Sequence, residues 1–201
     1  FDLLSKFDVV GTYNREQFFS EFIHLDITSR NEVDRVFLEQ KHDVVIHTSN
    51  YASSRLAENN TEGFTKLNLE ATAIVKDAAN KNGIKVIFVS SFASLDPTDI
   101  YGELKVKSEE IIKSVKSGYF ILRPSLILGL SPNTQNDRPF NRMFNCIGKV
   151  TVSEFDTSWR FQPTYIGHIS NIISKVVESN RWNKTVHIFS PSVQTQFSTA
   201  S

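Results

Sequence analysis

Short apolar runs alternate along the chain with longer segments whose apolar residues recur at helical spacing. The runs predict strands near Phe7–Gly11, Asp43–Thr48, Lys85–Ser90, Tyr119–Leu128 and Thr185–Phe189. Strands that alternate with helices are typical of β-α-β units, whose right-handed crossovers cover both faces of a parallel sheet with helices. The pattern therefore predicts an α/β fold built on a doubly wound parallel sheet.

The segments between these strands carry signals that start and stop helices. Ser29 and Glu32 form a capping-box pattern at the start of one helix. Gly83 stands where a long amphipathic helix would end. Helices are predicted over about Ser29–Gln40 and Thr61–Asn82, around Tyr101 and Lys105, and over Ile166–Val177.

The two ends of the chain differ from its middle. Phe1–Lys6 looks like the last turn of a helix, so we expect the native protein to begin further upstream. Residues from Ser131 to Arg160 mix Pro, Asn, Arg and Phe without a period, and we expect them to form loops and a cover element over the sheet edge.

Charge and composition exclude several classes of function. Lys plus Arg and Asp plus Glu number 22 each, so no overall field would draw the protein to nucleic acid or to an anionic membrane. No apolar run approaches the roughly 18 residues of a membrane span. The single cysteine, Cys146, is interpreted as apolar filler and fits a reducing cytoplasm. The histidines show no metal-ligand spacing, so we expect no metal site.

Tyr101 and Lys105 share one face of their predicted helix because their spacing is i, i+4. An ammonium beside a phenol lowers the phenol pKa from about 10 towards neutrality, and such a phenol can give a proton to a reduced carbonyl. Ser91, at the end of the preceding strand, could donate a hydrogen bond to the same carbonyl. Taken singly, a solvated helix face explains the Tyr-Lys spacing better, and a turn or cap explains the serine better.

Other polar residues follow the carboxyl ends of strands, where open parallel sheets bind their ligands. Arg15 stands in a loop without an acidic partner for a ribose hydroxyl, which favours a 2′-phosphate and hence NADP over NAD. Asp26 could face an adenine, while Thr48 and Ser49 could line a cofactor. A solvated loop arginine is an equally good interpretation of Arg15, and helix capping competes for Asp26.

The succession of strand, Ser-Ser, short loop, Tyr-x-x-x-Lys helix, strand and Arg-Pro resembles the extended short-chain dehydrogenase/reductase family over nearly the whole chain. Val86–Ser91 and Arg160–Tyr165 look most like its dTDP-4-dehydrorhamnose reductase branch, which also holds the regulatory beta subunit of methionine adenosyltransferase. The resemblance implies a Rossmann-like NAD(P)-binding domain over residues 1–130 and a substrate-side segment over 131–201, with elements that return to the sheet. It also implies a cytoplasmic, NADP-dependent reduction of a keto group on a nucleotide-linked sugar, and it permits a homodimer.

The same resemblance assigns roles to individual residues. Tyr101 would be the general acid, Lys105 would bind the nicotinamide ribose, and Ser91 would hold the carbonyl. Contacts to NADP, or to NAD, would come from Arg15, Asp26, Ile27, Thr48, Ser49, Lys105 and the backbone at Arg123 and Pro124. Substrate contacts would come from Asn68, Arg160 and Gln162, with helix packing as the alternative role of Asn68.

Three departures from the family keep other functions open. None of the eight glycines belongs to a Gly-x-x-Gly-x-x-Gly turn that would receive a pyrophosphate, which we attribute to an incomplete N-terminus. Only nine residues separate Ser91 from Tyr101, and Phe92 replaces the acidic residue expected after the hydroxyl donor. The alternatives are an epimerase or dehydratase of the same fold, a non-catalytic NAD(P)-binding regulatory subunit, and a degenerate domain that binds nothing.

Overall fold

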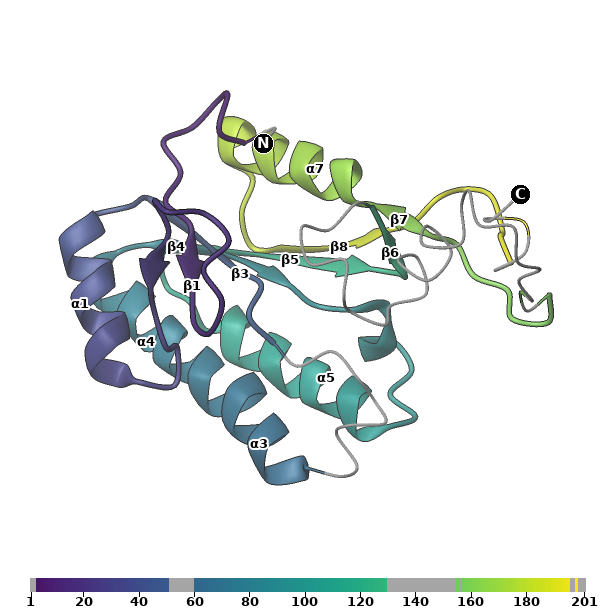
Figure 1. Ribbon diagram of the computed structural model, residues 1–201, viewed down its shortest axis with the longest axis horizontal. Coiled ribbons are helices and arrows are strands. Elements are labelled where there is room, and N and C mark those ends of the chain that lie inside the picture. The colour runs from purple at the N-terminus through teal and green to yellow at the C-terminus, as the bar shows by residue number, and fades with distance from the viewer. Residues whose placement is uncertain (1–2, 51–59, 130–154, 156, 196–197, 199–201) are drawn as a thin grey trace.

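The computed structural model describes residues 3–50, 60–129, 155, 157–195 and 198. Its centre is a four-stranded parallel sheet in the order β3-β4-β5-β8 (Figure 1). The strands are β3 (Val44–His47), β4 (Lys85–Val89), β5 (Tyr119–Pro124) and β8 (Lys184–Ile188). Cys146 and most of the predicted loop segment after Ser131 lie outside the described residues.

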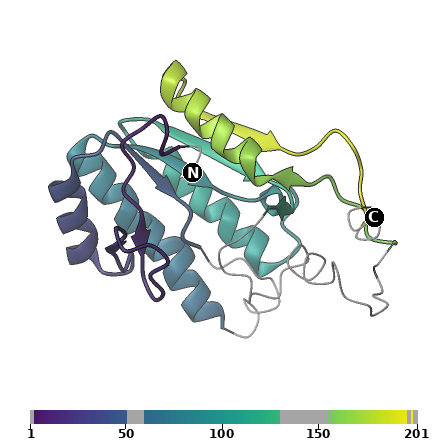
Figure 2. The ribbon, with the colours of Figure 1, turned by 45° about the horizontal axis from the view of Figure 1, so that its top comes forward.

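Helices cover both faces of this sheet, so the doubly wound α/β architecture is confirmed (Figure 2). One layer holds α1 (Arg30–Gln40), α4 (Ala71–Asn82) and α5 (Ile100–Lys113), and the other holds α7 (Ile166–Ser179). Each layer encloses its own buried apolar core against the sheet. None of the helices in the described ranges is both long and apolar enough to cross a membrane.

The predicted helix over Thr61–Asn82 contains a π-helical turn. A short helix, α3 (Thr61–Thr65), runs into the π turn η1 (Lys66–Glu70) before α4 begins. Gly83 ends α4 in the left-handed conformation with φ of 70°, as its position in the sequence predicts. The π turn itself leaves no signal in the sequence, because the apolar period continues through it.

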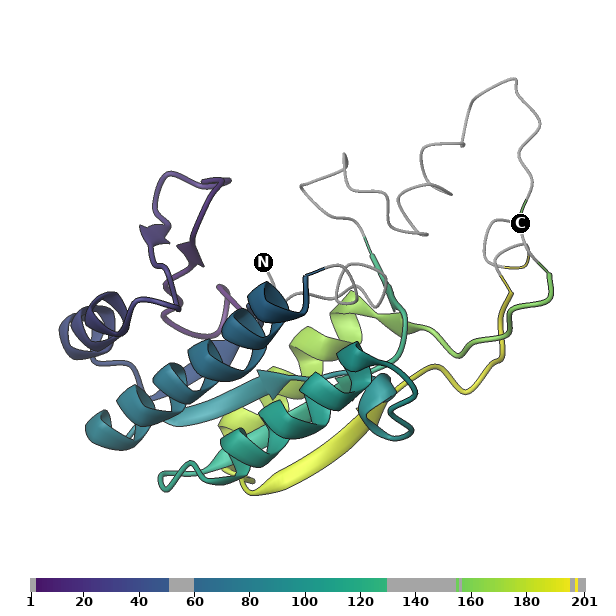
Figure 3. The ribbon, with the colours of Figure 1, turned by 90° about the horizontal axis from the view of Figure 1, so that it is seen from below.

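The first predicted strand is wrong in extent. Instead of a strand over Phe7–Gly11, the structure has a two-residue strand, β1 (Thr12–Tyr13), paired in parallel with β2 (Ile23–His24). Figure 3 shows these strands set apart from the main sheet. Within the described residues, the partner strand β2 pairs with Thr12 and Tyr13, and residues 7–11 have no strand beside them to extend the ladder.

A cavity of about 650 Å³ separates β1 from β3. Its walls are mainly apolar and come from both helix layers as well as from the two strands: Val10, Gly11, Val36, Phe37, Val44, Ile46, Ile173 and Val177. Among the described strands, β3 pairs only with β4, and its second edge faces this cavity. The cavity therefore lies between the two helix layers. The described edges of β1 and β3 that face it have no partner strand.

The predicted strand over Tyr119–Leu128 is interrupted after Pro124. A separate strand, β6 (Ile127–Leu128), pairs in parallel with β7 (Thr164–Tyr165) instead of continuing in the main sheet. Fully buried Thr164 links the two segments on either side of this break. Its hydroxyl donates to the Ile188 carbonyl and accepts from the Ser125 amide at 3.0 Å.

Candidate active site

Tyr101 and Lys105 lie at the start of α5, on the face that packs against the sheet. Asp99 caps the helix by accepting a hydrogen bond from the Gly102 amide at 2.7 Å. Lys105 is only 3% exposed, whereas Tyr101 is half-buried. The Lys105 Nζ lies 5.7 Å from the centroid of the Tyr101 ring and 5.1 Å from that of Phe88. The i, i+4 spacing thus brings the ammonium and the phenol ring into one small volume.

The surroundings of Lys105 lower its pKa towards neutral pH. Burial lowers the pKa of Lys105 to about 8, although the negative charge of Glu109 opposes the shift. The ammonium donates a hydrogen bond to the Val89 carbonyl at the end of β4, at 3.2 Å. Nearby His47 is buried, and burial together with the Lys105 charge lowers the His47 pKa to about 3, so the imidazole is neutral.

Ser91 occupies the turn that follows β4. Its side-chain oxygen accepts a hydrogen bond from the Ala93 amide at 3.2 Å and so caps a short 3-10 helix, η2 (Phe92–Ser94). This is the capping role that the sequence offered as an alternative. A hydroxyl that accepts one hydrogen bond still carries a proton to donate. Capping and carbonyl binding by Ser91 are therefore compatible.

Gly102 allows the Ser91 turn to lie directly against the first turn of α5. A Cβ at this position would come within 2.9 Å of the Ala93 carbonyl oxygen and 3.0 Å of the Pro97 Cα. Both atoms belong to the backbone of the short connection that follows Ser91. Sequence reasoning passed over Gly102, whose signal was its place beside Tyr101 in a helix that disfavours glycine.

Sequence reasoning also missed Glu109, which is 1% exposed on the inner face of α5. It accepts hydrogen bonds from Ser90 Oγ at 2.5 Å and Ser94 Oγ at 2.8 Å, and it forms a bidentate ion pair with Arg123 at 2.9 and 2.5 Å. Burial would raise the pKa of Glu109, but the bonds from Arg123 and the two serines outweigh it and hold the carboxylate ionised. The Arg123 side chain is thus paired with Glu109, and its backbone is the part predicted to meet a cofactor.

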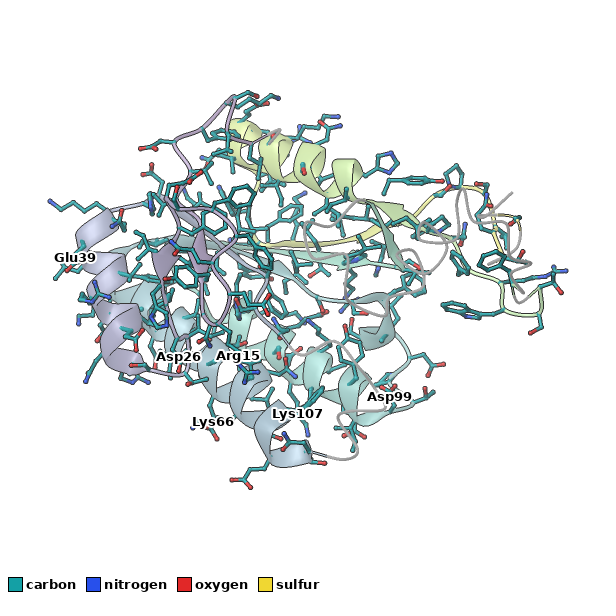
Figure 4. All side chains as sticks on the ribbon, in the orientation of Figure 1. Arg15, Asp26, Glu39, Lys66, Asp99 and Lys107 are labelled. Atoms are coloured by element: carbon teal, nitrogen blue, oxygen red, sulfur yellow. The ribbon has the colours of Figure 1, made fainter. Side chains whose placement is uncertain are left out.

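The residues predicted to meet the adenosine end lie on the β1–β2 side. Arg15 is exposed on the loop after β1, and Figure 4 labels it together with Asp26 and Lys66. The Asp26 carboxylate accepts hydrogen bonds from the Thr28 amide at 2.9 Å and hydroxyl at 2.8 Å. These bonds, aided by the charge of Lys66, lower the Asp26 pKa. Ser29, not Asp26, caps α1.

Three further predicted cofactor residues line the cavity between β1 and β3. Buried Ile27 contributes from the segment after β2, and exposed Thr48 and Ser49 follow the carboxyl end of β3. Pro124 is the buried last residue of β5. Ile27, Thr48 and Ser49 therefore share one cavity, while Pro124 and Arg123 lie at the end of a neighbouring strand.

Unlike Ile27, Thr48 and Ser49, the three predicted substrate residues do not line the cavity between β1 and β3. Asn68 is 1% exposed in η1, and its carbonyl accepts a hydrogen bond from Ser108 of α5 at 2.9 Å. The Gln162 amide donates to the backbone carbonyl of Ser190 at 3.0 Å. Arg160 is exposed. Asn68 and Gln162 thus have structural contacts, and Arg160 is the member of the group that is open to solvent.

Parallel sheets of this kind bind ligands at the carboxyl ends of their strands, which is where Ser91, Tyr101 and Lys105 gather. Fold and site together define a Rossmann-like α/β protein with a Ser, Tyr and Lys constellation at the end of β4. The chain belongs to the RmlD substrate binding domain family, whose model matches residues 4–201.

Solved structures share the fold. The dTDP-4-dehydrorhamnose reductase of Bacillus anthracis, in complex with NADP, is 22% identical with a TM-score of 0.76, covering 88% of this chain and 66% of its own. A hypothetical dTDP-4-dehydrorhamnose reductase from Sulfolobus tokodaii is 18% identical with a TM-score of 0.81, covering 98% and 73%. The enzyme WbmG of Bordetella bronchiseptica, in complex with NAD, is 13% identical with a TM-score of 0.76, covering 92% and 63%.

The chain thus spans 66% of the Bacillus anthracis structure, slightly less than two thirds of its length. No curated protein matches the chain. Since these structural likenesses lie below 25% identity, they establish the fold.

Proposed function

We propose that this chain is the larger part of an NADP-dependent reductase that acts on a keto group of a nucleotide-linked sugar. The observation that carries the proposal is the convergence of Tyr101 and Lys105 on α5 with Ser91 on the adjoining turn. Membership of the RmlD substrate binding domain family supports the substrate class.

Each of these residues has a distinct part in the proposed reaction. The Ser91 hydroxyl donates a hydrogen bond to the substrate carbonyl and polarises it. Tyr101 delivers its phenolic proton to the developing alkoxide, and the Lys105 ammonium favours the phenolate that remains. Because Lys105 is almost wholly buried, its charge acts through a medium of low polarity and is felt strongly by the phenol.

The residues present suit both ends of a dinucleotide cofactor, which would supply the hydride. Arg15 offers an exposed cation for a 2′-phosphate, and Asp26 and Ile27 would border the adenine. Thr48 and Ser49 line the cavity and would face the middle of the cofactor, while Lys105 and the backbone at Arg123 and Pro124 would meet its nicotinamide end. The glycine turn for the pyrophosphate does not occur among the residues of this chain.

The substrate contacts proposed for Asn68, Arg160 and Gln162 are less directly supported. Arg160 is the favoured member because an exposed guanidinium can pair bidentately with the diphosphate of a nucleotide sugar. Gln162 would act by holding the segment that carries Arg160 against the backbone of Ser190.

The test is a turnover assay of the full-length protein with NADPH and a panel of 4-keto sugar nucleotides. Oxidation of NADPH with formation of a reduced sugar would support the proposal, and product analysis would separate reduction from epimerisation or dehydration. Absence of turnover with every member of the panel would contradict it. Light scattering and microscopy of a tagged protein would test the predicted homodimer and the cytoplasmic location.

A non-catalytic regulatory subunit is the second candidate, and one observation favours it. Phe92 is 42% exposed directly after Ser91 and makes edge-on ring contacts with His187 and Phe189. This aromatic cluster stands where the reductases have an acidic residue. Recovery of a stoichiometric enzyme partner, with cofactor bound and never oxidised, would favour the subunit over the reductase.

A further inference from the structure

Glu109 extends the inner face of α5 beyond Lys105. Tyr101, Lys105 and Glu109 succeed one another at i, i+4 and i+8, so they form one row along the helix. Glu109 is the most buried of the three, with an exposed fraction of only 1%. The hydrogen bonds described for the Glu109 carboxylate run to Ser90, Ser94 and Arg123, and through them Glu109 would act on the Ser91 turn.

Those partners bracket Ser91 on both sides. Ser90 Oγ donates to Glu109 Oε1 at 2.5 Å from the end of β4. Ser94 Oγ lies 2.8 Å from Glu109 Oε1 and also 2.8 Å from the Ser91 carbonyl oxygen, so its single O–H is shared between the two acceptors. The carboxylate thus connects α5 with the residue before Ser91 and with the turn after it.

Arg123 of β5 completes the attachment and balances the charge. Its bidentate contact with Glu109, at 2.9 and 2.5 Å, fixes the plane of the carboxylate. Buried ion pairs generally add little stability compared with apolar side chains of similar volume. A geometric role therefore explains the buried pair better than a stabilising one.

We propose that Glu109 is a positioning residue that holds the Ser91 turn in register with the Tyr101 and Lys105 face of α5. The inference rests on the proposed reductase function, because it gives Glu109 a task in presenting Ser91 and Tyr101 to one carbonyl. Misplacement of a reacting group by about 1 Å can cost about a hundredfold in rate. Glu109 can therefore affect the rate of reduction without touching the substrate.

Glu109 also acts on the charge of Lys105. The groups around the ammonium are Glu109 and Tyr101 on α5, neutral His47 on β3 and, through Glu109, the Arg123 guanidinium on β5. Glu109 is the carboxylate that raises the Lys105 pKa against the effect of burial. Without it, the pKa of Lys105 would fall below about 8, and the ammonium would be lost at a lower pH.

The experiment compares Glu109→Gln with Glu110→Gln in the full-length protein. Glu110 is the matched control, because its side chain is 66% exposed and forms an exposed ion pair with Lys113 on the same helix. We expect Glu109→Gln to lower kcat by at least about tenfold and to move the alkaline limb of the kcat/KM profile to lower pH. Glu110→Gln should match the wild type in both. An unchanged kcat and an unchanged pH profile in Glu109→Gln would overturn the proposal.

A double variant, Glu109→Leu with Arg123→Met, separates positioning from stability. Replacing a buried pair by apolar side chains commonly preserves stability, but buried Ser90 also loses its acceptor here. We therefore expect a melting temperature no lower than that of Glu109→Gln, with turnover still reduced. Recovery of wild-type turnover in this variant would show that the pair serves stability alone.

Failure of the reductase function would be recognised separately. In that case the wild type shows no turnover, or Tyr101→Phe turns over normally. Hydrogen exchange of the Ser91–Leu95 amides then tests the positioning directly. Faster exchange in Glu109→Gln, and not in Glu110→Gln, would support the positioning role even without catalysis, and identical exchange in both would refute it.

Discussion

The carboxyl edge of the sheet differs between its β4–β5 half and its β1–β2 half in how many contacts hold the side chains in place. Around β4, β5 and α5, the side chains of the candidate catalytic residues are held by groups from three elements, and Lys105 and Glu109 are almost wholly buried. Around β1 and β2, the ladder is two residues long and borders a cavity of about 650 Å³. The side proposed to handle the proton is thus held by many contacts within this chain, whereas the side proposed to bind the nucleotide has few such contacts among the described residues.

The difference teaches that the two tasks of the proposed enzyme are structurally separable. The contacts described for Ser91 and for the pair of Tyr101 and Lys105 come from β4, from α5 and from the turn between them. Changes on one side should therefore affect chemistry, and changes on the other should affect cofactor affinity. The following predictions test this separation.

The largest effect is expected on the side proposed to handle the proton. Tyr101→Phe removes the proton donor and keeps the ring beside Lys105, so turnover should fall by at least about a hundredfold. The dissociation constant for NADPH should stay within about twofold of the wild type, as read by fluorescence titration. Turnover at the wild-type rate would remove Tyr101 from the mechanism.

Stability should respond differently to the same substitution in the two regions. Gly102→Ala forces a Cβ against the backbone of Ala93 and Pro97, and it should cost about 1–3 kcal/mol of unfolding free energy. Gly11→Ala meets the ring of Phe22 more closely still. That ring borders the open cavity and can turn aside, so the cost there should stay below about 1 kcal/mol.

Gly167→Ala is the control for both variants in denaturant unfolding. Gly167 lies in the first turn of α7, as Gly102 does in α5, and a Cβ at Gly167 meets nothing within 4 Å. The variant should be neutral or up to about 1 kcal/mol more stable, since alanine favours helix. If Gly102→Ala behaved in the same way, the close approach of the Ser91 turn would have no energetic consequence.

On the nucleotide side, Arg15→Ala should change cofactor preference without changing chemistry. Loss of one exposed charge-assisted contact should lower kcat/KM for NADPH by about tenfold and leave that for NADH nearly unchanged. Arg35→Ala is the comparison, because Arg35 is exposed on α1 and bonded to Glu39 at 3.1 Å. An equal loss for both cofactors would argue against a 2′-phosphate contact by Arg15.

The smallest effect is a change with pH. Since burial sets the Lys105 pKa at about 8, the ammonium is present below that pH and is lost as the pH rises through it. The kcat/KM of reduction should fall to about half its plateau near the pKa and continue downward. A plateau that extends unchanged beyond pH 10 would show that the Lys105 charge is not needed.

The sequence was a good guide where local signals decide the structure. The main strands follow from their apolar runs, and the ends of α1 and α4 follow from Ser29 and Gly83. The extent of β1 was wrong because strand length depends on neighbours distant in the chain. The break after Pro124 was missed for a related reason, since it depends on a hydrogen bond from the Ser125 amide to Thr164.

The same limit applies to the site. Tyr101, Lys105 and Ser91 were predicted because their types and order carry a recognisable chemistry, and their catalytic roles stay a prediction. Glu109 was not found, because an acidic residue in an amphipathic helix usually lies on the solvent face. Its burial depends on Arg123 in β5 and on Ser90, which directly follows β4, and no periodicity reveals contacts between residues so far apart in the sequence.

The open edge of β3 also bears on how a polypeptide of residues 1–201 would behave by itself. Within the described ranges, the second edge of β3 has no partner strand and faces an apolar cavity. Such an edge is a template on which another chain can add a strand, and exposed edges drive aggregation during folding. Expressed alone, this polypeptide would therefore self-associate in a concentration-dependent way. Choosing the expression boundaries is thus as much a question of solubility as of function.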